Sequence, residues 1–471
     1  MSSSFASTRL SYDAASRSWS EPLPELDSPR TLVLCFGASH FEPFQEALDA
    51  IQRVYPSSVI LGCSTSGEIH GTEVRDDSLC VGIVRFAHTE LSVVSASIDH
   101  SEDSYEVGAR IARELWREDL RAVLILSDGL IVNGSALVRG VNSQLPGEVI
   151  VTGGLAGDGP RFEKTWILEG GECVSNAISA VGFYGDHLRM GHGSQGGWDK
   201  FGPVRSITRS EGNVLYELDG KPALALYKTY LGDRAKELPA SGLLFPISLL
   251  DLGSEERNVV RTLLAVDHEE QSLTFAGDVP EGTRIQLMRA HFERLVEGAR
   301  DAASLANVED LDSSLVIAVS CVGRRLVLEE RASEELVAVE RSLGESSTLV
   351  GFYSYGELSP VEDGRCDLHN QTMTLTVIGE SPEPLGLPLL EYAAPRLKAS
   401  QEEHATPRSR RANTPGEDDE ANAQEKKKKM PHDDVTQESQ ESHEPQRSST
   451  WRFLLIAVIL AAIVVALAVM Q

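Results

Sequence analysis

The chain of 471 residues is 41% hydrophobic and 24% charged, close to the globular average, which excludes a wholly disordered chain and a polytopic membrane protein. It carries 43 Lys and Arg against 71 Asp and Glu, a formal net charge of −28. Because no cationic surplus is available to neutralise phosphates, nucleic acid is excluded as the main partner. At roughly 100–200 residues per domain, the length predicts two or three domains.

The first half of the chain alternates short apolar strands with amphipathic helices. Residues 1–30 lack the apolar segment of a secretory signal, and we interpret them as an extension before the first domain. The predicted strands are 31–37, 57–64, 78–86, 91–98, 122–129, 148–154, 164–169 and 177–184, and the predicted helices are 41–54, 105–115 and 136–144. A glycine-rich segment at 191–198 is interpreted as a loop.

The second half opens with a helix at 222–232, which begins with proline and ends at glycine and marks the entrance of a second domain. Hairpin-like runs follow at 261–266, 271–276 and 284–289, then a helix at 291–306, strands at 314–320 and 347–353 around a helix at 333–343, and a last strand at 370–379. The order predicts an α/β or α+β fold with two related domains, residues 31–220 and 221–380, built from repeated β-α-β units.

Residues 396–450 differ from the preceding chain. They are rich in Glu, Gln, Ser, Pro, Asp and Lys and contain almost no large apolar residue, so we expect a disordered linker. The segment holds ten basic and twelve acidic residues, which means that the excess negative charge belongs to the residues before it. Its tetralysine run, 426–429, is interpreted as solvated linker charge.

The last segment, Phe453 to Met470, has eighteen residues without a polar side chain. As a helix it would be about 27 Å long, against a hydrocarbon core of roughly 30 Å. Trp451 and Arg452 suit the membrane interface. We predict a single-pass transmembrane helix at 451–470, the alternative being a buried core helix, which seldom lacks a polar face. Basic residues before the helix place the folded domains in the cytoplasm, tail-anchored to the lipid bilayer.

The two ends of the folded region resemble each other. GCSTSGEI (62–69) matches GFYSYGEL (351–358), and both follow a predicted strand-helix-strand order. A weaker third copy, GGLAGD, closes at 153–158. The shared order of elements favours internal duplication over coincidence.

Each copy ends in a glycine followed by a carboxylate, namely Glu68, Asp158 or Glu357. Glycine lets the backbone approach a ligand closely, and open α/β sheets bind ligands beside the carboxyl ends of strands. The alternative is that each carboxylate accepts backbone N–H groups and holds a tight turn. The three copies together predict a shared cleft in which carboxylates contact the polar groups of a small molecule. The predicted ligand contacts are Ser64, Thr65, Gly67, Glu68, Gly157, Asp158, Tyr355, Gly356, Glu357, His369 and Asn370.

The same segments resemble the FIST proteins. The resemblance rests on GCSTSGEI (62–69), GGLAGD (153–158), ELDGKPALALYKTYLG (217–232) and GFYSYGELSP with LHNQTMTLT (351–376). It runs from about residue 31 to 379 and does not include the tail. It implies a cytoplasmic ligand-sensing input domain for signal transduction, with amino-acid-like metabolites as ligands and a signalling protein as a further partner. The chain shows no output module.

Cofactor and enzyme hypotheses are weaker. Some members of the family bind haem, for which His192 and His369 are the axial candidates, but a lone histidine near glycines is more often an ordinary loop residue, so we predict no cofactor. Six scattered cysteines without a C-x-x-C pair indicate reduced thiols and no metal site.

A hydrolase or transferase would use Cys63 or Ser64 as nucleophile. The segment GCSTSG lacks the G-x-S-x-G spacing of a nucleophile elbow, and we expect no enzyme. The leading hypothesis is therefore a membrane-tethered sensory protein that binds a small metabolite. The alternatives are a membrane-anchored scaffold that docks a basic protein and a haem-based gas sensor.

Overall fold

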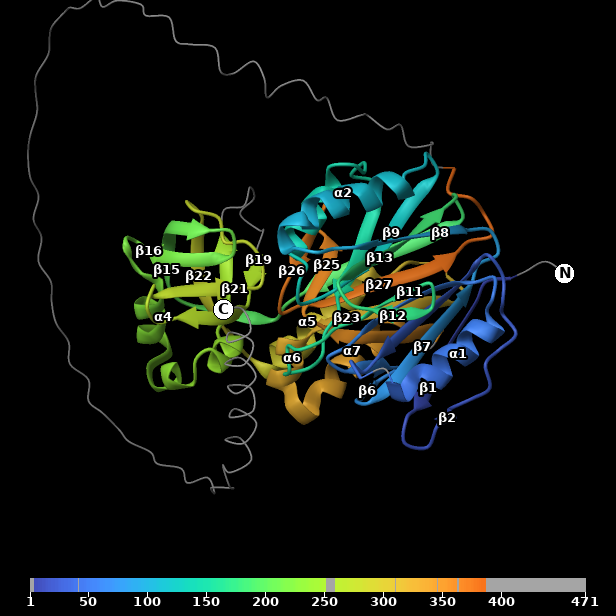
Figure 1. The fold of residues 1–471 in the computed structure, drawn as a ribbon, viewed down its shortest axis with the longest axis horizontal. Helices are drawn as coiled ribbons and strands as arrows, with labels where there is room; N and C mark the ends of the chain where they lie inside the picture. Colours follow the sequence, from blue (N-terminus) through green and yellow to red (C-terminus); the bar gives the residue numbers. More distant parts are fainter. Residues whose placement is uncertain are drawn as a thin grey trace, which may run out of the picture. The chain divides into compact units, whose positions relative to one another are not determined.

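The computed structural model describes residues 4–40, 42–250, 259–309, 311–344, 346–361 and 364–386. These residues form helices and many short strands, so the mixed α/β fold expected from the sequence is confirmed (Figure 1). The predicted linker and the predicted transmembrane helix lie outside the described residues. Within the described part of the chain, no helix is both long enough and apolar enough to cross a membrane.

Three tandem repeats make up most of the described chain, and each holds a parallel β-α-β unit, a short hairpin and a closing strand. The first comprises β1 (Ala6–Asp13), β2 (Ser18–Trp19), β3 (Thr31–Gly37), α1 (Gln45–Val54), β4 (Val59–Ser64), β5 (Glu68–His70), β6 (Glu73–Arg75) and β7 (Ser78–Arg85). The second comprises β8 (Glu90–Ser97), α2 (Ser104–Leu115), β9 (Leu120–Ser127), α3 (Gly134–Asn142), β10 (Ile150–Leu155), β11 (Ile167–Glu169), β12 (Glu172–Val174) and β13 (Ala177–Tyr184).

The third repeat has the same order but is interrupted by an insertion, which we call the β-lobe (residues 198–290). The repeat comprises β14 (Leu188–Gln195), α5 (Phe292–Ala306), β23 (Ser314–Cys321), α6 (Val322–Leu328), α7 (Ala332–Leu343), β24 (Ser347–Ser354), β25 (Gly356–Pro360), β26 (Cys366–His369) and β27 (Met373–Glu380). The β-lobe comprises β15 (Trp198–Glu211), β16 (Val214–Leu218), β17 (Lys221–Pro222), α4 (Ala223–Leu231), β18 (Ile247–Leu250), β19 (Val259–Arg261), β20 (Leu263–Asp267), β21 (Ser272–Phe275) and β22 (Arg284–Ala290).

Each repeat contributes one sheet with the same pairing. β3 pairs in parallel with β4, β9 with β10, and β23 with β24. The closing strands β7, β13 and β27 pair antiparallel with β3, β9 and β23, and the opening strands β1, β8 and β14 pair with the closing strands. The duplication expected from the sequence is therefore threefold within the described residues, and the weaker copy is as complete as the other two.

The hairpins are exchanged cyclically among the sheets. β5 of the first repeat pairs with β24 of the third, β11 of the second pairs with β4 of the first, and β25 of the third pairs with β10 of the second. Because each hairpin completes the sheet of another repeat, no repeat has its full sheet without its neighbours.

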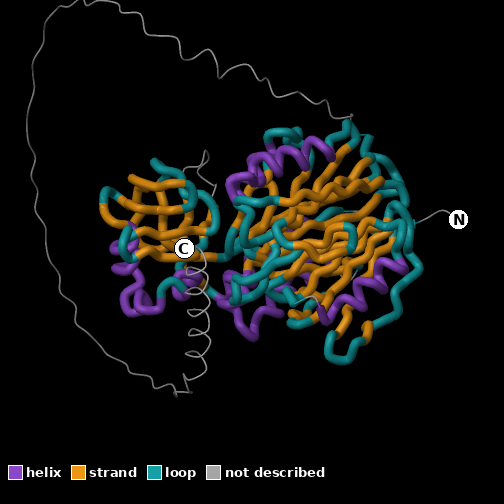
Figure 2. Tube along the Cα trace, in the orientation of Figure 1, coloured by secondary structure: helices purple, strands orange, loops and turns teal. Residues whose placement is uncertain are grey.

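The three sheets share one apolar core. Alternate residues of each strand point inward, such as Leu32, Leu34 and Phe36 of β3, and they meet Leu124 of β9 and Ile317 of β23. Helices cover the outer faces (Figure 2). The intervening residues pack under α1 in the first repeat, under α2 and α3 in the second, and under α5 and α7 in the third.

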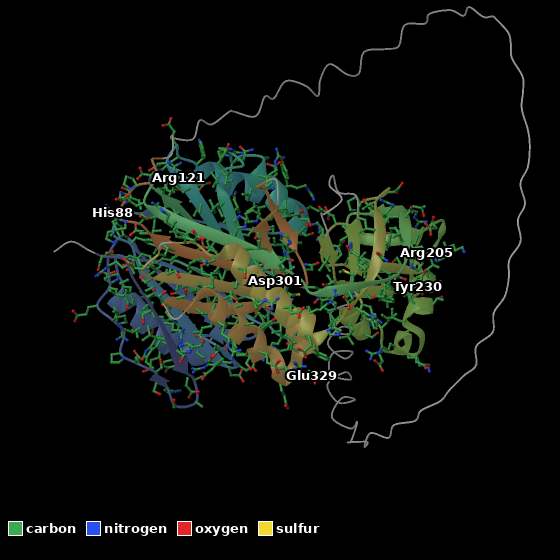
Figure 3. All side chains as sticks on the ribbon, turned by 180° about the vertical axis from the view of Figure 1, so that it is seen from behind. His88, Arg121, Arg205, Tyr230, Asp301 and Glu329 are labelled. Carbon is green, nitrogen blue, oxygen red and sulfur yellow. The ribbon has the colours of Figure 1, made fainter. Side chains whose placement is uncertain are left out.

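The β-lobe has a separate core, which is covered by α4. On its surface Arg205 donates from Nε and Nη2 to the hydroxyl of Tyr230, at 3.0 and 2.6 Å (Figure 3). The predicted helix 222–232 is confirmed as α4. The predicted boundary at 220–221 falls between β16 and β17, which pair with each other inside the β-lobe.

Two interpretations of local structure were wrong. The glycine-rich segment forms most of strand β14 rather than a loop, because Gly191 and Gly193 let α5 pack closely: a Cβ at either would collide with the carbonyl of Ala306 or Ala302. Residues 6–13, assigned to an extension, form β1, which pairs along its whole length with β7.

Candidate functional site

The carboxyl ends of the parallel strands meet at one end of the central core. We call this region the carboxyl end and define it by Ser64, Leu155 and Ser354, the last residues of β4, β10 and β24. The amide of Gly157 donates to the Ser64 carbonyl at 3.1 Å, and the amide of Tyr355 donates to the Leu155 carbonyl at 3.1 Å. The motifs of the three repeats therefore contact one another here.

Glu68 is buried and bound by hydroxyl groups of its own repeat. It accepts from Thr65 Oγ1 at 2.5 Å, from Ser78 Oγ at 2.7 Å and from the Ser78 amide at 3.1 Å. Burial disfavours the charged form and raises the pKa of Glu68 to about 7, although the three hydrogen bonds oppose this.

Glu357 repeats this arrangement in the third repeat. It accepts from Ser354 Oγ at 2.7 Å, from Thr372 Oγ1 at 2.9 Å and from the Thr372 amide at 3.3 Å. Burial raises the pKa of Glu357 to about 8, and the same hydroxyl bonds counteract part of the shift. In both repeats the first hydroxyl comes from three positions before the glutamate.

The matching position in the second repeat is Ile167 and not Asp158. Glu68 lies opposite Phe352, Glu357 lies opposite Gly154, and Ile167 lies opposite Cys63, each at the same register of an exchanged hairpin. Ile167 packs into the central core.

The hydroxyl partner of the acid is lost together with the acid. The matching residue is Ser78 at the start of β7 or Thr372 just before β27 where the hairpin carries glutamate. It is Ala177, at the start of β13, where the hairpin carries Ile167. An unpaired buried carboxyl is costly, so acid and hydroxyl form one structural unit.

Asp158 instead closes a longer loop, residues 158–165, that is found in the second repeat. Its carboxylate accepts from the amides of Phe162, Glu163 and Lys164 at 2.9, 2.7 and 2.9 Å, and also from the hydroxyl of Tyr355. These contacts agree with the alternative weighed from the sequence, in which the carboxylate accepts backbone N–H groups and holds a turn.

The loop 158–165 bridges the three repeats at the carboxyl end. The Tyr355 hydroxyl also donates to the Gly159 carbonyl at 2.8 Å, and the Gly159 amide donates to Ser66 Oγ at 3.0 Å. The Phe162 ring stacks on Tyr355 with centroids 4.7 Å apart. Gly157 is required because a Cβ there would collide with Ser66 Oγ.

The other two predicted glycines also sit in close contacts. Gly67 has a φ of +132°, and a Cβ on it would collide with the guanidinium of Arg325, which donates to the Ser66 carbonyl. A Cβ on Gly356 would lie 2.9 Å from Leu368 Cδ1. Both glycines therefore serve tight packing of the protein itself.

His369 and Asn370 lie farther along the third repeat, where it contacts the β-lobe. His369 is paired with Glu357 across β25 and β26, and its Nε2 lies 3.1 Å from the Ser359 carbonyl. Asn370 Oδ1 accepts from the Thr262 amide of the β-lobe at 3.3 Å. These two residues have structural partners that differ from those of the three acids.

The two nucleophile candidates are enclosed. Cys63 is fully buried, and burial raises the pKa of its thiol well above the ordinary value, so the reactive thiolate is disfavoured. Ser64 is also fully buried, and its Oγ accepts from the Trp166 amide at 3.1 Å. Neither residue is placed to attack a substrate.

The haem candidates do not fit an axial role. His192 lies on β14 between the glycines that pack on α5, where burial lowers its pKa, and His369 Nε2 is already beside a carbonyl. Neither lines the hollow around His100 and Leu130 or the hollow around Tyr55 and Val93. Among the described residues, no group of three or more His, Cys, Asp or Glu side chains is placed to hold a metal ion.

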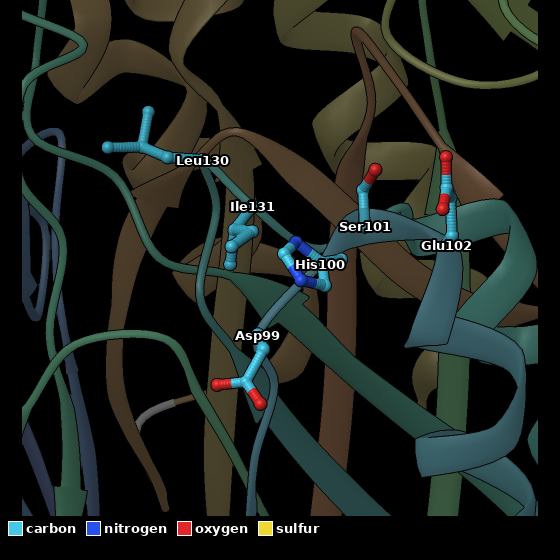
Figure 4. A pocket seen from close by; sticks show the side chains of 6 residues that line it. All are labelled: Asp99, His100, Ser101, Glu102, Leu130 and Ile131. Carbon is cyan, nitrogen blue, oxygen red and sulfur yellow. The ribbon is translucent and has the colours of Figure 1, made fainter.

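Sequence reasoning missed a hollow of about 310 Å³ at the carboxyl end of the second repeat (Figure 4). It is lined by Asp99, His100, Ser101, Glu102, Leu130 and Ile131. These residues follow the ends of β8 and β9 and share no motif with the other copies, so no pattern in the sequence pointed to them.

Asp128 fixes one wall of this hollow. Its Oδ1 accepts from the amides of Leu130 and Ile131 at 2.8 and 3.0 Å, and its Oδ2 accepts from Thr165 Oγ1 at 2.7 Å. The carboxylate thus joins the loop after β9 to the loop 158–165.

Comparison with known proteins identifies two family domains. Residues 31–221 match the family described as FIST N domain, and residues 223–360 match the family described as FIST C domain. An uncharacterized protein of Methanocaldococcus jannaschii is 25% identical over 317 residues, which cover 61% of this chain and 59% of that protein. An uncharacterized protein of Mycobacterium tuberculosis is 24% identical over 359 residues, 74% of this chain and 91% of the relative.

A solved structure, a cyanuric acid hydrolase, aligns over 80% of this chain and 100% of its own, with 9% identity and a TM-score of 0.29. A score this low carries no argument about fold or activity. The names of the two relatives state no ligand or partner.

Proposed function

Because the chain belongs to the FIST family, with a FIST N domain followed by a FIST C domain, we propose that it senses a small metabolite bound at its carboxyl end. FIST domains are sensory, ligand-binding domains of signal transduction. The proposal for this chain concerns the place of binding, the kind of ligand and the location of the protein.

The observation that carries the proposal is the meeting of three repeats at the carboxyl end. One loop, 158–165, is bonded to Ser66 of the first repeat and to Tyr355 of the third, and through Thr165 it is bonded to Asp128 beside the hollow. A ligand in the hollow can shift this loop and thereby alter contacts among all three repeats. Such a linkage converts binding into a change that a partner protein can read.

The hollow suits a small molecule with a cationic group. Asp99 and Glu102 are exposed acids, and Leu130 and Ile131 supply apolar surface beside them. The buried acids Glu68, Asp158 and Glu357 are instead occupied by the protein's own donors. We therefore assign the ammonium of an amino-acid-like ligand to the acids of the hollow.

Membrane tethering and a cytoplasmic location remain part of the proposal. They rest on the apolar run 453–470 and the basic residues that precede it. Cell fractionation tests them directly: the full-length protein should resist carbonate extraction of membranes, and a chain ending at residue 450 should be released.

A thermal-shift screen of amino-acid-like metabolites on the full-length protein tests the function. We expect at least one compound to raise the unfolding midpoint by several degrees, because binding to the folded state alone stabilises it. In Leu130→Arg the bulky cation should fill the hollow and abolish the rise.

Val204→Arg is the matched control, since Val204 of the β-lobe is 43% exposed and Leu130 is 42% exposed. This variant should respond like the wild type. A screen in which no compound stabilises the wild type contradicts the sensory function. A ligand that stabilises Leu130→Arg as strongly as the wild type contradicts the location in the hollow.

A further inference from the structure

The loop 158–165 carries an arginine that no sequence motif singled out. In the first and third repeats, one glycine separates Ser66 or Tyr355 from the glutamate of the hairpin, whereas in the second repeat nine residues separate Gly157 from Ile167. The extra residues place Arg161 at the carboxyl end, close to the first repeat.

Arg161 is only partly satisfied by the protein. Its Nη2 donates to Ser39 Oγ at 2.9 Å, and Ser39, on the loop after β3, is 3% exposed. Its Nε is enclosed and has no hydrogen-bond partner among the described residues. An enclosed guanidinium N–H without an acceptor is unfavourable, so an oxygen supplied by a ligand would stabilise it.

No carboxylate of the described residues forms an ion pair with Arg161, although the chain has a large excess of acids. Asp158, an acid of the same loop, is occupied by three backbone amides and by Tyr355. Arg325, another arginine at the carboxyl end, is already paired with Asp76 at 2.5 Å. Arg161 thus keeps an uncompensated charge.

We propose that Arg161 and Ser39 form an oxyanion subsite that binds a carboxylate or phosphate group of the ligand. A guanidinium presents parallel N–H donors to two oxygens, and the planar fork matches both groups. The inference rests on the proposed function and specifies it further: the ligand is anionic at this subsite, and its binding restrains the loop that bridges the three repeats.

The subsite is tested on the full-length protein with three simple probes at millimolar concentration: inorganic phosphate, succinate and putrescine. Phosphate or succinate should raise the unfolding midpoint of the wild type. Any rise caused by putrescine, a cation, should be the same in Arg161→Gln as in the wild type. Isothermal titration with the active anion should give at least a tenfold weaker affinity for Arg161→Gln than for the wild type. The anion that binds with the higher affinity shows whether the subsite prefers a phosphate or a carboxylate group.

Arg110→Gln is the matched control, because Arg110 is exposed on α2 of the same repeat. It should bind the anion like the wild type. Ser39→Ala keeps the charge of Arg161 and should weaken binding to a smaller extent, which guards against a folding defect in Arg161→Gln. Unchanged anion affinity in Arg161→Gln overturns the subsite, and so does the absence of any response to phosphate and succinate.

Failure of the subsite is distinguishable from failure of the sensory function. If a metabolite stabilises the wild type and Arg161→Gln equally, the protein senses a ligand without this oxyanion contact. If no metabolite stabilises the wild type at all, the proposed function itself is wrong.

Discussion

At the scale of single residues, Glu68 and Glu357 show how a carboxyl group can be buried when neighbouring hydroxyl and amide groups donate hydrogen bonds to it. Glu68 and Glu357 point inward from matching positions, and each binds two hydroxyls and one amide. Neither forms an ion pair among the described residues. Because the second repeat replaces both the acid and its hydroxyl partner, by Ile167 and Ala177, the pair behaves as a unit whose members are retained or lost together.

The raised pKa values of Glu68 and Glu357 predict that their contribution to the free energy of unfolding falls as the pH rises. The ordinary pKa of a glutamate is 4.5, whereas the folded values are about 7 for Glu68 and about 8 for Glu357. The folded state therefore holds protons that the unfolded chain has released, and this contribution is complete below about pH 4.5 and lost as pH rises through 7 to 8.

Glu357→Gln should remove most of the pH-dependent loss of stability that Glu357 causes, because glutamine does not ionise. Between pH 5.5 and pH 9 the wild type should lose on the order of 3 kcal/mol more unfolding free energy than the variant, measured by urea denaturation. Glu297→Gln, an exposed change on α5, should retain the wild-type pH dependence. Equal slopes for the wild type and Glu357→Gln would show that Glu357 is ionised at neutral pH in the folded protein.

At the scale of elements, the hydroxyl of Tyr355 ties the loop 158–165 to the third repeat. Tyr355 donates to Asp158 and to the Gly159 carbonyl, and its ring stacks on Phe162. Asp158 in turn gathers the amides that follow it in the loop. Because Tyr355 belongs to the third repeat, the conformation of this loop depends on a contact between repeats.

Tyr355→Phe should loosen the loop while keeping the ring stack. Loss of the hydrogen bonds should cost about 1–3 kcal/mol. Trypsin should then cleave faster after Arg161 and Lys164, which is measured by limited digestion of the native protein and mass spectrometry. Tyr105→Phe, on the exposed face of α2, should be cleaved at the wild-type rate. A digestion pattern unchanged in Tyr355→Phe would mean that other contacts hold the loop.

The sequence reveals the parts of a repeat that keep the same short spacing, and it does not reveal parts that depend on an insertion or on a contact distant in sequence. Glu68 and Glu357 could be matched because the spacing from hydroxyl to glycine to acid is the same in both motifs. Asp158 fits the same short pattern, yet the insertion after it moves the true counterpart to Ile167, which has no polar atom to reveal it. The strand β14 was interpreted as a loop because its glycines reflect packing against α5, a contact that is distant in sequence.

At the scale of the whole molecule, the exchange of hairpins explains why three repeats act as one body. Each sheet is completed by a strand from another repeat, and all three sheets share a core. The sequence could predict the repeats from their order of elements, but the exchange is a property of tertiary pairing. The hollow beside Asp128 could not be predicted for the same reason, since its walls follow two strands, β8 and β9.

The exchange also gives the carboxyl end its proposed role. Ser66, Asp158 and Tyr355 belong to three different repeats and meet only there. A ligand in the hollow lies against the second repeat, and Asp128 and Thr165 connect this place to the loop that joins all three repeats, so local binding can be transmitted without a separate moving domain. We therefore expect a small molecule to bind here and to restrain the loop 158–165.

Hydrogen–deuterium exchange of the full-length protein, with and without a stabilising metabolite, measures this restraint. Backbone amides report local opening, and a bound ligand slows exchange where it restrains the chain. Protection should increase in residues 128–133 and 158–165, with little change in the β-lobe. Protection confined to the β-lobe, or an exchange pattern unaltered by the ligand at the carboxyl end, would contradict binding at this place.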